Sequence, residues 1–191
     1  MEWLRRELVQ HYRWLREGGY NDSHSGNASV RTRDSILITP TGAWAERLRP
    51  EALVQWPLTA EPPAAASMDA RLHQAVYAAL PQAGAILHSH CPHLVALTLG
   101  GHPFVPRDFE GLHYFGPQVP VVEVDPAHYF EQSPARTAEA LRSAPAAVVR
   151  GHGVYVWGAG LEQAFQRTTA VELSAKIAWL ACLQQACAPD G

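Results

Sequence analysis

Two histidines separated by one residue carry the strongest chemical signal in the chain. His88 and His90 follow the apolar run 85–87, which is typical of a buried β-strand. Because side chains on a strand alternate between its two faces, both imidazoles point the same way and could chelate one ion. A solvated pair at the end of a strand would have the same spacing, so the spacing alone leaves both interpretations open.

A third histidine from elsewhere would complete a tri-imidazole site with an open position for water or substrate. That arrangement is typical of catalytic zinc rather than structural zinc. His152 is the best candidate, because Gly151 and Gly153 on either side of it allow the backbone to turn sharply between two predicted strands.

Hydrophobic periodicity predicts the elements that must position these side chains. Ser67 is expected to cap a helix with Asp69 in its first turn, and the helix that begins at Pro92 should carry His93 away from the histidine pair. We predict strands over 28–31, 35–39, 84–90, 119–124, 146–149 and 154–157, and helices over 2–17, from Ser67 to Pro81, from Pro92 to Leu99, from Ser133 and from Leu161.

Length and composition favour one folded domain over residues 1–191. The chain is 47% hydrophobic and 17% charged, and a domain of this size hides roughly 70% of its unfolded surface. The net charge of −3 and the lack of a dense Lys/Arg run argue against nucleic acid as a partner. No apolar run is long enough to span a membrane and three cysteines form no disulfide framework, so we expect a cytoplasmic protein.

Four blocks of sequence are each modest but specific when taken together in their order and spacing. They are residues 25–31, residues 38–42, residues 72–77 running into 85–90, and residues 150–158. Over nearly the whole chain, these blocks resemble the class II aldolase/adducin family. The resemblance implies an α/β fold, a three-layer α/β/α domain with a mainly antiparallel central sheet, and cyclic homotetramers with active sites at subunit boundaries.

The same resemblance implies which residues bind metal and substrate. It assigns His88, His90 and His152 to a divalent ion, expected to be Zn²⁺, although a tri-histidine site also accepts Mn²⁺ or Co²⁺. It also implies a cradle for the phosphate of a sugar-phosphate substrate, formed by Gly26, Asn27, Thr41, Gly42 and Ser67. Small residues that expose backbone N–H groups to an anion agree with this assignment, and two ordinary turns around a hairpin are the alternative.

Two carboxylates compete for the acid–base role. Sugar-phosphate aldolases usually carry Ser-Ser-Glu where this chain has Ser67-Met68-Asp69, which removes one hydroxyl and shortens the acid by a methylene. The dehydratase-like branch of the family instead uses a glutamate that corresponds to Glu110. The sequence leaves the choice between Asp69 and Glu110 open.

The resemblance therefore implies a metal-dependent lyase, because both branches must stabilise an enediolate formed next to a ketone. The leading hypothesis is retro-aldol cleavage of a short ketose 1-phosphate, similar to fuculose or ribulose phosphate, into dihydroxyacetone phosphate and an aldehyde. The alternative is dehydration of methylthioribulose 1-phosphate. A third hypothesis, a non-catalytic adducin-like module, follows from the altered Ser67-Met68-Asp69 segment.

Overall fold

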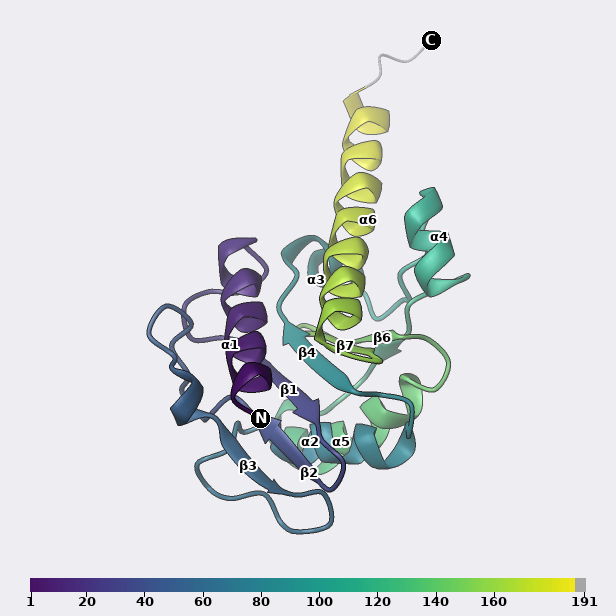
Figure 1. The fold of residues 1–191 in the computed structure, drawn as a ribbon. Coiled ribbons are helices and arrows are strands. Elements are labelled where there is room, and N and C mark those ends of the chain that lie inside the picture. Colours follow the sequence, from purple (N-terminus) through teal and green to yellow (C-terminus); the bar gives the residue numbers. More distant parts are fainter. Residues whose placement is uncertain (188–191) are drawn as a thin grey trace.

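A seven-stranded sheet runs through the computed structural model, which describes residues 1–187 (Figure 1). Its strands are β1 (Asn27–Arg31), β2 (Ser35–Ile38), β3 (Val54–Pro57), β4 (Ala85–Ser89), β5 (Val121–Val122), β6 (Ala146–Val149) and β7 (Gly153–Gly158). The α-helices are α1 (Glu2–Glu17), α2 (Ala70–Ala79), α3 (Pro92–Thr98), α4 (Phe109–Phe115), α5 (Tyr129–Ala140) and α6 (Leu161–Cys187). Short 3₁₀ turns lie at Pro50–Ala52 and Pro126–His128.

The strand order is β3-β2-β1-β4-β7-β6-β5, and every neighbouring pair is antiparallel except β5 and β6. The prediction of a mainly antiparallel sheet is therefore confirmed, with one parallel pair added. A parallel pair needs a crossover connection, and α5 supplies it between β5 and β6. The sheet brings β4 beside β7, although these strands are far apart in the sequence.

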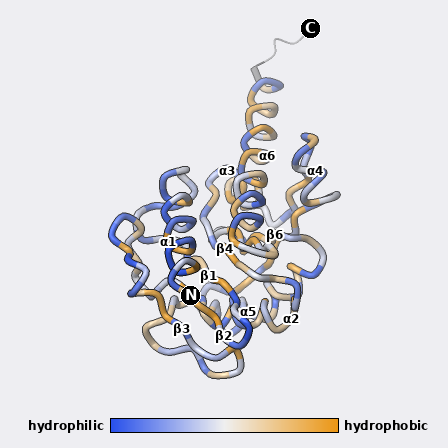
Figure 2. Tube along the Cα trace, in the orientation of Figure 1, coloured by the Kyte–Doolittle hydropathy of each residue, from blue (hydrophilic) through white to orange (hydrophobic). Residues whose placement is uncertain are grey.

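Helices cover both faces of the sheet, which confirms the three-layer α/β/α architecture. In Figure 1, α2 and α5 lie below the sheet and pack against each other, while α1, α3 and α6 lie above it. Each face buries its own apolar clusters, and Figure 2 shows hydrophobic residues along the strands between the layers. Within residues 1–187, no helix is both long and apolar enough to cross a membrane.

Two helices begin at different residues from those predicted. Ser67 does not cap α2: the helix begins at Ala70, Asp69 is the N-cap residue, and the Ser67 hydroxyl accepts a bond from the Asp69 N–H at 3.3 Å. The helix α5 begins at Tyr129, four residues before the predicted start at Ser133, and Pro134 lies inside it. Because α2 and α5 both lie below the sheet (Figure 1), Asp69 and Tyr129 belong to that layer.

Candidate active site

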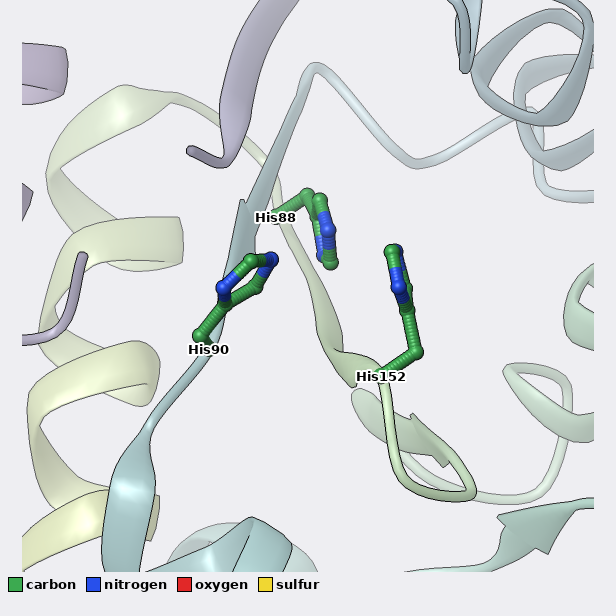
Figure 3. Close-up of side chains that lie close together, drawn as sticks. All are labelled: His88, His90 and His152. Carbon is green, nitrogen blue, oxygen red and sulfur yellow. The ribbon is translucent and has the colours of Figure 1, made fainter. Parts of the chain in front are cut away.

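The three predicted metal ligands meet at one edge of the central strands (Figure 3). His88 lies on β4, His90 directly follows β4, and His152 lies in the turn between β6 and β7. Because β4 pairs with β7, this turn lies beside the end of β4. One ligand nitrogen from each imidazole lies within 4.8 Å of those of the other two, which is close enough for a single ion.

The protonation of these imidazoles fits a divalent metal. The Nδ1–H of His88 donates to the Val154 carbonyl at 3.0 Å, so its Nε2 is the free ligand atom. The Nε2 of His152 is buried and has no hydrogen-bond partner among residues 1–187. Burial lowers the pKa of His88 to about 3, although Asp69 opposes the effect, and burial also lowers the pKa of His90 and His152. All three are therefore neutral at neutral pH, as metal binding requires.

Gly153 lets the histidines approach one another closely. A Cβ atom at this position would lie 2.6 Å from the Ser89 carbonyl oxygen, 2.7 Å from Cε1 of His88 and 3.1 Å from Cδ2 of His90. The Ser89 backbone cannot move away without a large cost in energy, so any side chain at this position would displace the histidines.

Gly153→Ala is accordingly expected to weaken metal affinity about 10- to 100-fold, the usual effect of disturbing the groups that orient metal ligands. Competition with a chromogenic chelator would measure the dissociation constant. Gly160→Ala is the matched control, because a Cβ at Gly160 meets nothing within 4 Å and affinity should not change. Equal affinity in the Gly153→Ala and wild-type proteins would contradict the prediction.

Asp69 places a buried carboxylate beside the histidines. One of its oxygens lies 3.9 Å from Nε2 of His88, and the residue is only 8% exposed. Its Oδ2 accepts bonds from the Asn27 side-chain amide and the Tyr155 hydroxyl, each at 2.8 Å. Its Oδ1 accepts a bond from the Tyr129 hydroxyl at 3.1 Å.

These surroundings keep Asp69 ionised. Burial by itself raises the pKa of this carboxyl group, but the hydrogen bonds from Asn27 and Tyr155 stabilise the charged form and lower the pKa. A buried carboxylate with three donors and an adjacent cavity is suited to accept and return a proton during a reaction.

Two fully buried histidines should make the metal-free protein sensitive to acid. Burial lowers the pKa of His73 to about 4 and that of His88 to about 3. Since an unfolded histidine has a pKa of about 6.5, the unfolded chain binds more protons between about pH 4 and 6.5. The free energy of unfolding should therefore fall as pH drops through that window, by up to about 2.7 kcal/mol per pH unit for the two groups.

Urea unfolding of the metal-free protein at several pH values between 4 and 7 would measure this slope. His73→Gln removes one of the two groups and should reduce the slope by about half, even if it lowers stability at every pH. A pH-independent free energy of unfolding in that window would contradict the prediction.

The second predicted carboxylate lies elsewhere in the structure. Glu110 is exposed on α4, and it does not line the cavity that contains the histidines. Within one chain, the structure thus brings Asp69 to His88, His90 and His152 and leaves Glu110 outside the site.

A cavity of about 510 Å³ opens beside the histidines. All five residues expected to bind phosphate line it: Gly26, Asn27, Thr41, Gly42 and Ser67. Gly26 and Gly42 have φ angles of +71° and +64°, a conformation that glycine adopts at little cost and that turns backbone N–H groups outward. One N–H of the Asn27 side-chain amide donates to Asp69, which leaves its second N–H and the backbone for a ligand.

Two tyrosines that hold the carboxylate were not predicted from the sequence. Tyr155 stacks on His88 with ring centroids 4.1 Å apart, and Tyr129 begins α5. The sequence does contain a helix-start pattern before Tyr129: Asp125 followed by Pro126. In the structure, Asp125 caps the 3₁₀ turn by accepting a bond from the Ala127 N–H, and Pro126 is the first residue of that turn. That signal extends the helical segment back from Ser133 to the neighbourhood of Tyr129.

The fold and the site together have the layout of an enzyme with a cavity beside a possible metal-binding cluster. Residues 6–179 match the family model described as "Class II Aldolase and Adducin N-terminal domain". The chain belongs to this family, whose aldolases depend on a metal, and it is a lyase.

Individual relatives represent both branches of the family. The chain is 36% identical over 181 residues to methylthioribulose-1-phosphate dehydratase of Acidiphilium cryptum, a match that covers 87% of this chain and 85% of that protein. It is 30% identical over 191 residues to 5-methylthioribulose-1-phosphate/5-deoxyribulose-1-phosphate aldolase of Rhodospirillum rubrum, covering 95% and 82%. It is similar in structure to L-fuculose-1-phosphate aldolase from Thermus thermophilus, with a TM-score of 0.92, 34% identity and 98% of each chain covered.

Proposed function

We propose that this enzyme is a zinc-dependent aldolase that cleaves a short ketose 1-phosphate into dihydroxyacetone phosphate and an aldehyde. The observation that carries the proposal is the buried, ionised carboxylate of Asp69, 3.9 Å from His88. Retro-aldol cleavage needs one group to move protons next to a Lewis acid, and Asp69 is the carboxylate that the chain itself places there.

Each part of the site has a task in this reaction. The loops around Gly26 and Gly42, with the hydroxyls of Thr41 and Ser67, bind the phosphate through donated hydrogen bonds and so fix the substrate. Asp69 exchanges a proton with the substrate. A zinc ion held by the three histidines would supply Lewis-acid stabilisation of the enediolate that cleavage generates.

Incubation of the zinc-loaded enzyme with ribulose 1-phosphate, fuculose 1-phosphate and methylthioribulose 1-phosphate would test this function. We expect dihydroxyacetone phosphate and an aldehyde, detected by coupled reduction of the triose phosphate and by trapping of the aldehyde. Loss of water from methylthioribulose 1-phosphate without cleavage of a carbon–carbon bond would overturn the aldolase assignment.

Methylthioribulose-1-phosphate dehydratase is the second candidate, and the position of Glu110 favours it. Its neighbour Phe109 is 82% exposed on α4, which packs against α6. Along α6, large apolar side chains are also exposed: Leu173, Ile177, Trp179, Leu180 and Leu183. If another subunit covers this surface, Glu110 enters a subunit boundary, where the family places its active sites.

We also propose that residues 1–191 act as one class II aldolase/adducin-like domain in a cytoplasmic homotetramer. The exposed apolar surface of α4 and α6 supports the oligomer, because monomeric proteins rarely leave such patches uncovered. Sedimentation of the purified enzyme would test the tetramer. The complete histidine set argues against the non-catalytic adducin-like alternative.

A further inference from the structure

The hydroxyl of Tyr129 occupies a position between the carboxylate and the cavity. It donates to Oδ1 of Asp69 at 3.1 Å, and it lies 2.6 Å from the Tyr155 hydroxyl. The ring of Tyr129 lies beside His152, with centroids 5.0 Å apart, and it lines the cavity. This side chain therefore contacts the carboxylate and the metal site together.

The two tyrosines that touch Asp69 differ in their access to a substrate. Tyr155 is 0% exposed and stacked on His88, and it is not among the described residues that line the cavity. Tyr129 is only half-buried and does line it. Of the groups that hydrogen-bond to the Asp69 carboxylate, Tyr129 is thus the hydroxyl that a bound ligand can reach.

Asp69 lines the cavity itself, and a relay lets this short acid serve a second atom of the substrate. Aspartate is shorter by a methylene than the glutamate usual in sugar-phosphate aldolases, and the Asn27 and Tyr155 bonds hold its Oδ2 in the protein interior. A phenol bonded to Oδ1 extends the reach of the carboxylate toward the cavity by one O–H group.

We propose that Tyr129 is a catalytic residue, which relays a proton from the C4 hydroxyl of the ketose phosphate to Asp69. The proposal rests on the aldolase function proposed above.

The atoms balance over one turnover. The substrate's C4 hydroxyl gives its proton to the oxygen of Tyr129 while the phenol gives its own proton to Oδ1 of Asp69. The C4–O electrons form the aldehyde carbonyl, and the electron pair of the C3–C4 bond moves onto the enediolate. Asp69, now a carboxylic acid, returns the proton to C3 and completes dihydroxyacetone phosphate, so both side chains regain their starting states.

The protonation of Tyr129 is compatible with this role. Its hydroxyl donates a hydrogen bond to Oδ1 of Asp69, so the phenol holds the proton that a relay must pass on. A relay requires such a donor.

Tyr129→Phe tests the relay by separating two half-reactions. Cleavage needs a proton to leave the C4 oxygen, but exchange of the C3 hydrogen of dihydroxyacetone phosphate with deuterated water needs only Asp69 and the metal. We expect kcat for cleavage to fall by about 10²- to 10⁴-fold, the usual contribution of acid–base catalysis. We expect the exchange rate and metal content to stay within about threefold of wild type, which also shows that the variant is folded.

Tyr155→Phe is the matched control, because it also removes a hydroxyl that contacts Asp69 but one that substrate does not reach. Cleavage and exchange should fall together in this variant. The relay is overturned if Tyr129→Phe cleaves at the wild-type rate, if it loses exchange in parallel with cleavage, or if Tyr155→Phe shows the same selective loss. A wild-type enzyme that neither cleaves ketose phosphates nor exchanges the C3 hydrogen would instead refute the proposed function.

Discussion

Replacing Asp69 with asparagine is expected to lower kcat for ketose-phosphate cleavage by about 10²- to 10⁴-fold, the range that positioned acid–base groups contribute. The substitution keeps the size of the side chain but removes its ability to carry a proton. Because the three histidines remain, metal content should stay at the wild-type value. Steady-state kinetics would measure kcat, and mass spectrometry would measure metal content. Together they distinguish loss of the proton carrier from loss of the metal.

Asp69→Glu and Glu110→Gln complete this experiment. The glutamate variant keeps the charge and restores the acid that sugar-phosphate aldolases usually carry, so it should retain more activity than Asp69→Asn. Glu110 lies outside the cavity of its own chain, and Asp69 carries the proton in the proposed aldol cleavage, so Glu110→Gln should leave that cleavage within about threefold of wild type. A large loss of cleavage in Glu110→Gln with little change in Asp69→Asn would show that Glu110, and not Asp69, is the acid–base group.

His90→Ala should abolish stoichiometric metal binding and the stabilisation that metal confers. A ligand present at about 1,000 times its dissociation constant stabilises the folded state by about 4 kcal/mol. For a protein of this size, that corresponds to an increase in Tm of roughly 8–16 °C when zinc is added to the metal-free wild type. The variant should show almost none of this increase. Scanning calorimetry with and without zinc would measure both values.

His93→Ala controls for the loss of an imidazole near the same strand end. His93 follows His90 closely in the sequence but lies on α3, where its Nδ1 is 2.6 Å from a carboxylate oxygen of Glu172 on α6. It is not part of the histidine cluster, so this variant should keep the zinc-dependent increase in Tm. Full zinc-dependent stabilisation of His90→Ala would show that the three histidines are not the ligands.

The sequence predicted the layers of the fold and the grouping of the histidines better than the acid–base chemistry. Strand alternation alone placed His88 and His90 on one face, and the flanking glycines marked His152 as the partner. The family resemblance was still needed to decide between a metal site and a solvated pair, because local spacing carries no information about the third ligand's position in space.

The choice of carboxylate depended on contacts that local patterns do not contain. Asp69 is distinguished from Glu110 only when the N-terminus of α2 meets β1, β7 and α5, which supply Asn27, Tyr155 and Tyr129. A predicted helix start at Ser133 also puts Tyr129 in a loop, although the Asp125-Pro126 signal lies upstream. The error arises because a proline inside a helix has the same local pattern as a proline in its first turn.

The candidate metal site can form only if β4 and β7 pair in the correct register. His88 lies opposite Tyr155 in this ladder, so a ligand and the tyrosine that holds Asp69 share one alignment. A slip by one residue would turn the strand's side chains to the opposite faces and scatter the site. A bound ion would therefore favour the correct alignment of two strands that are distant in the sequence, and so stabilise the pairing at the middle of the sheet.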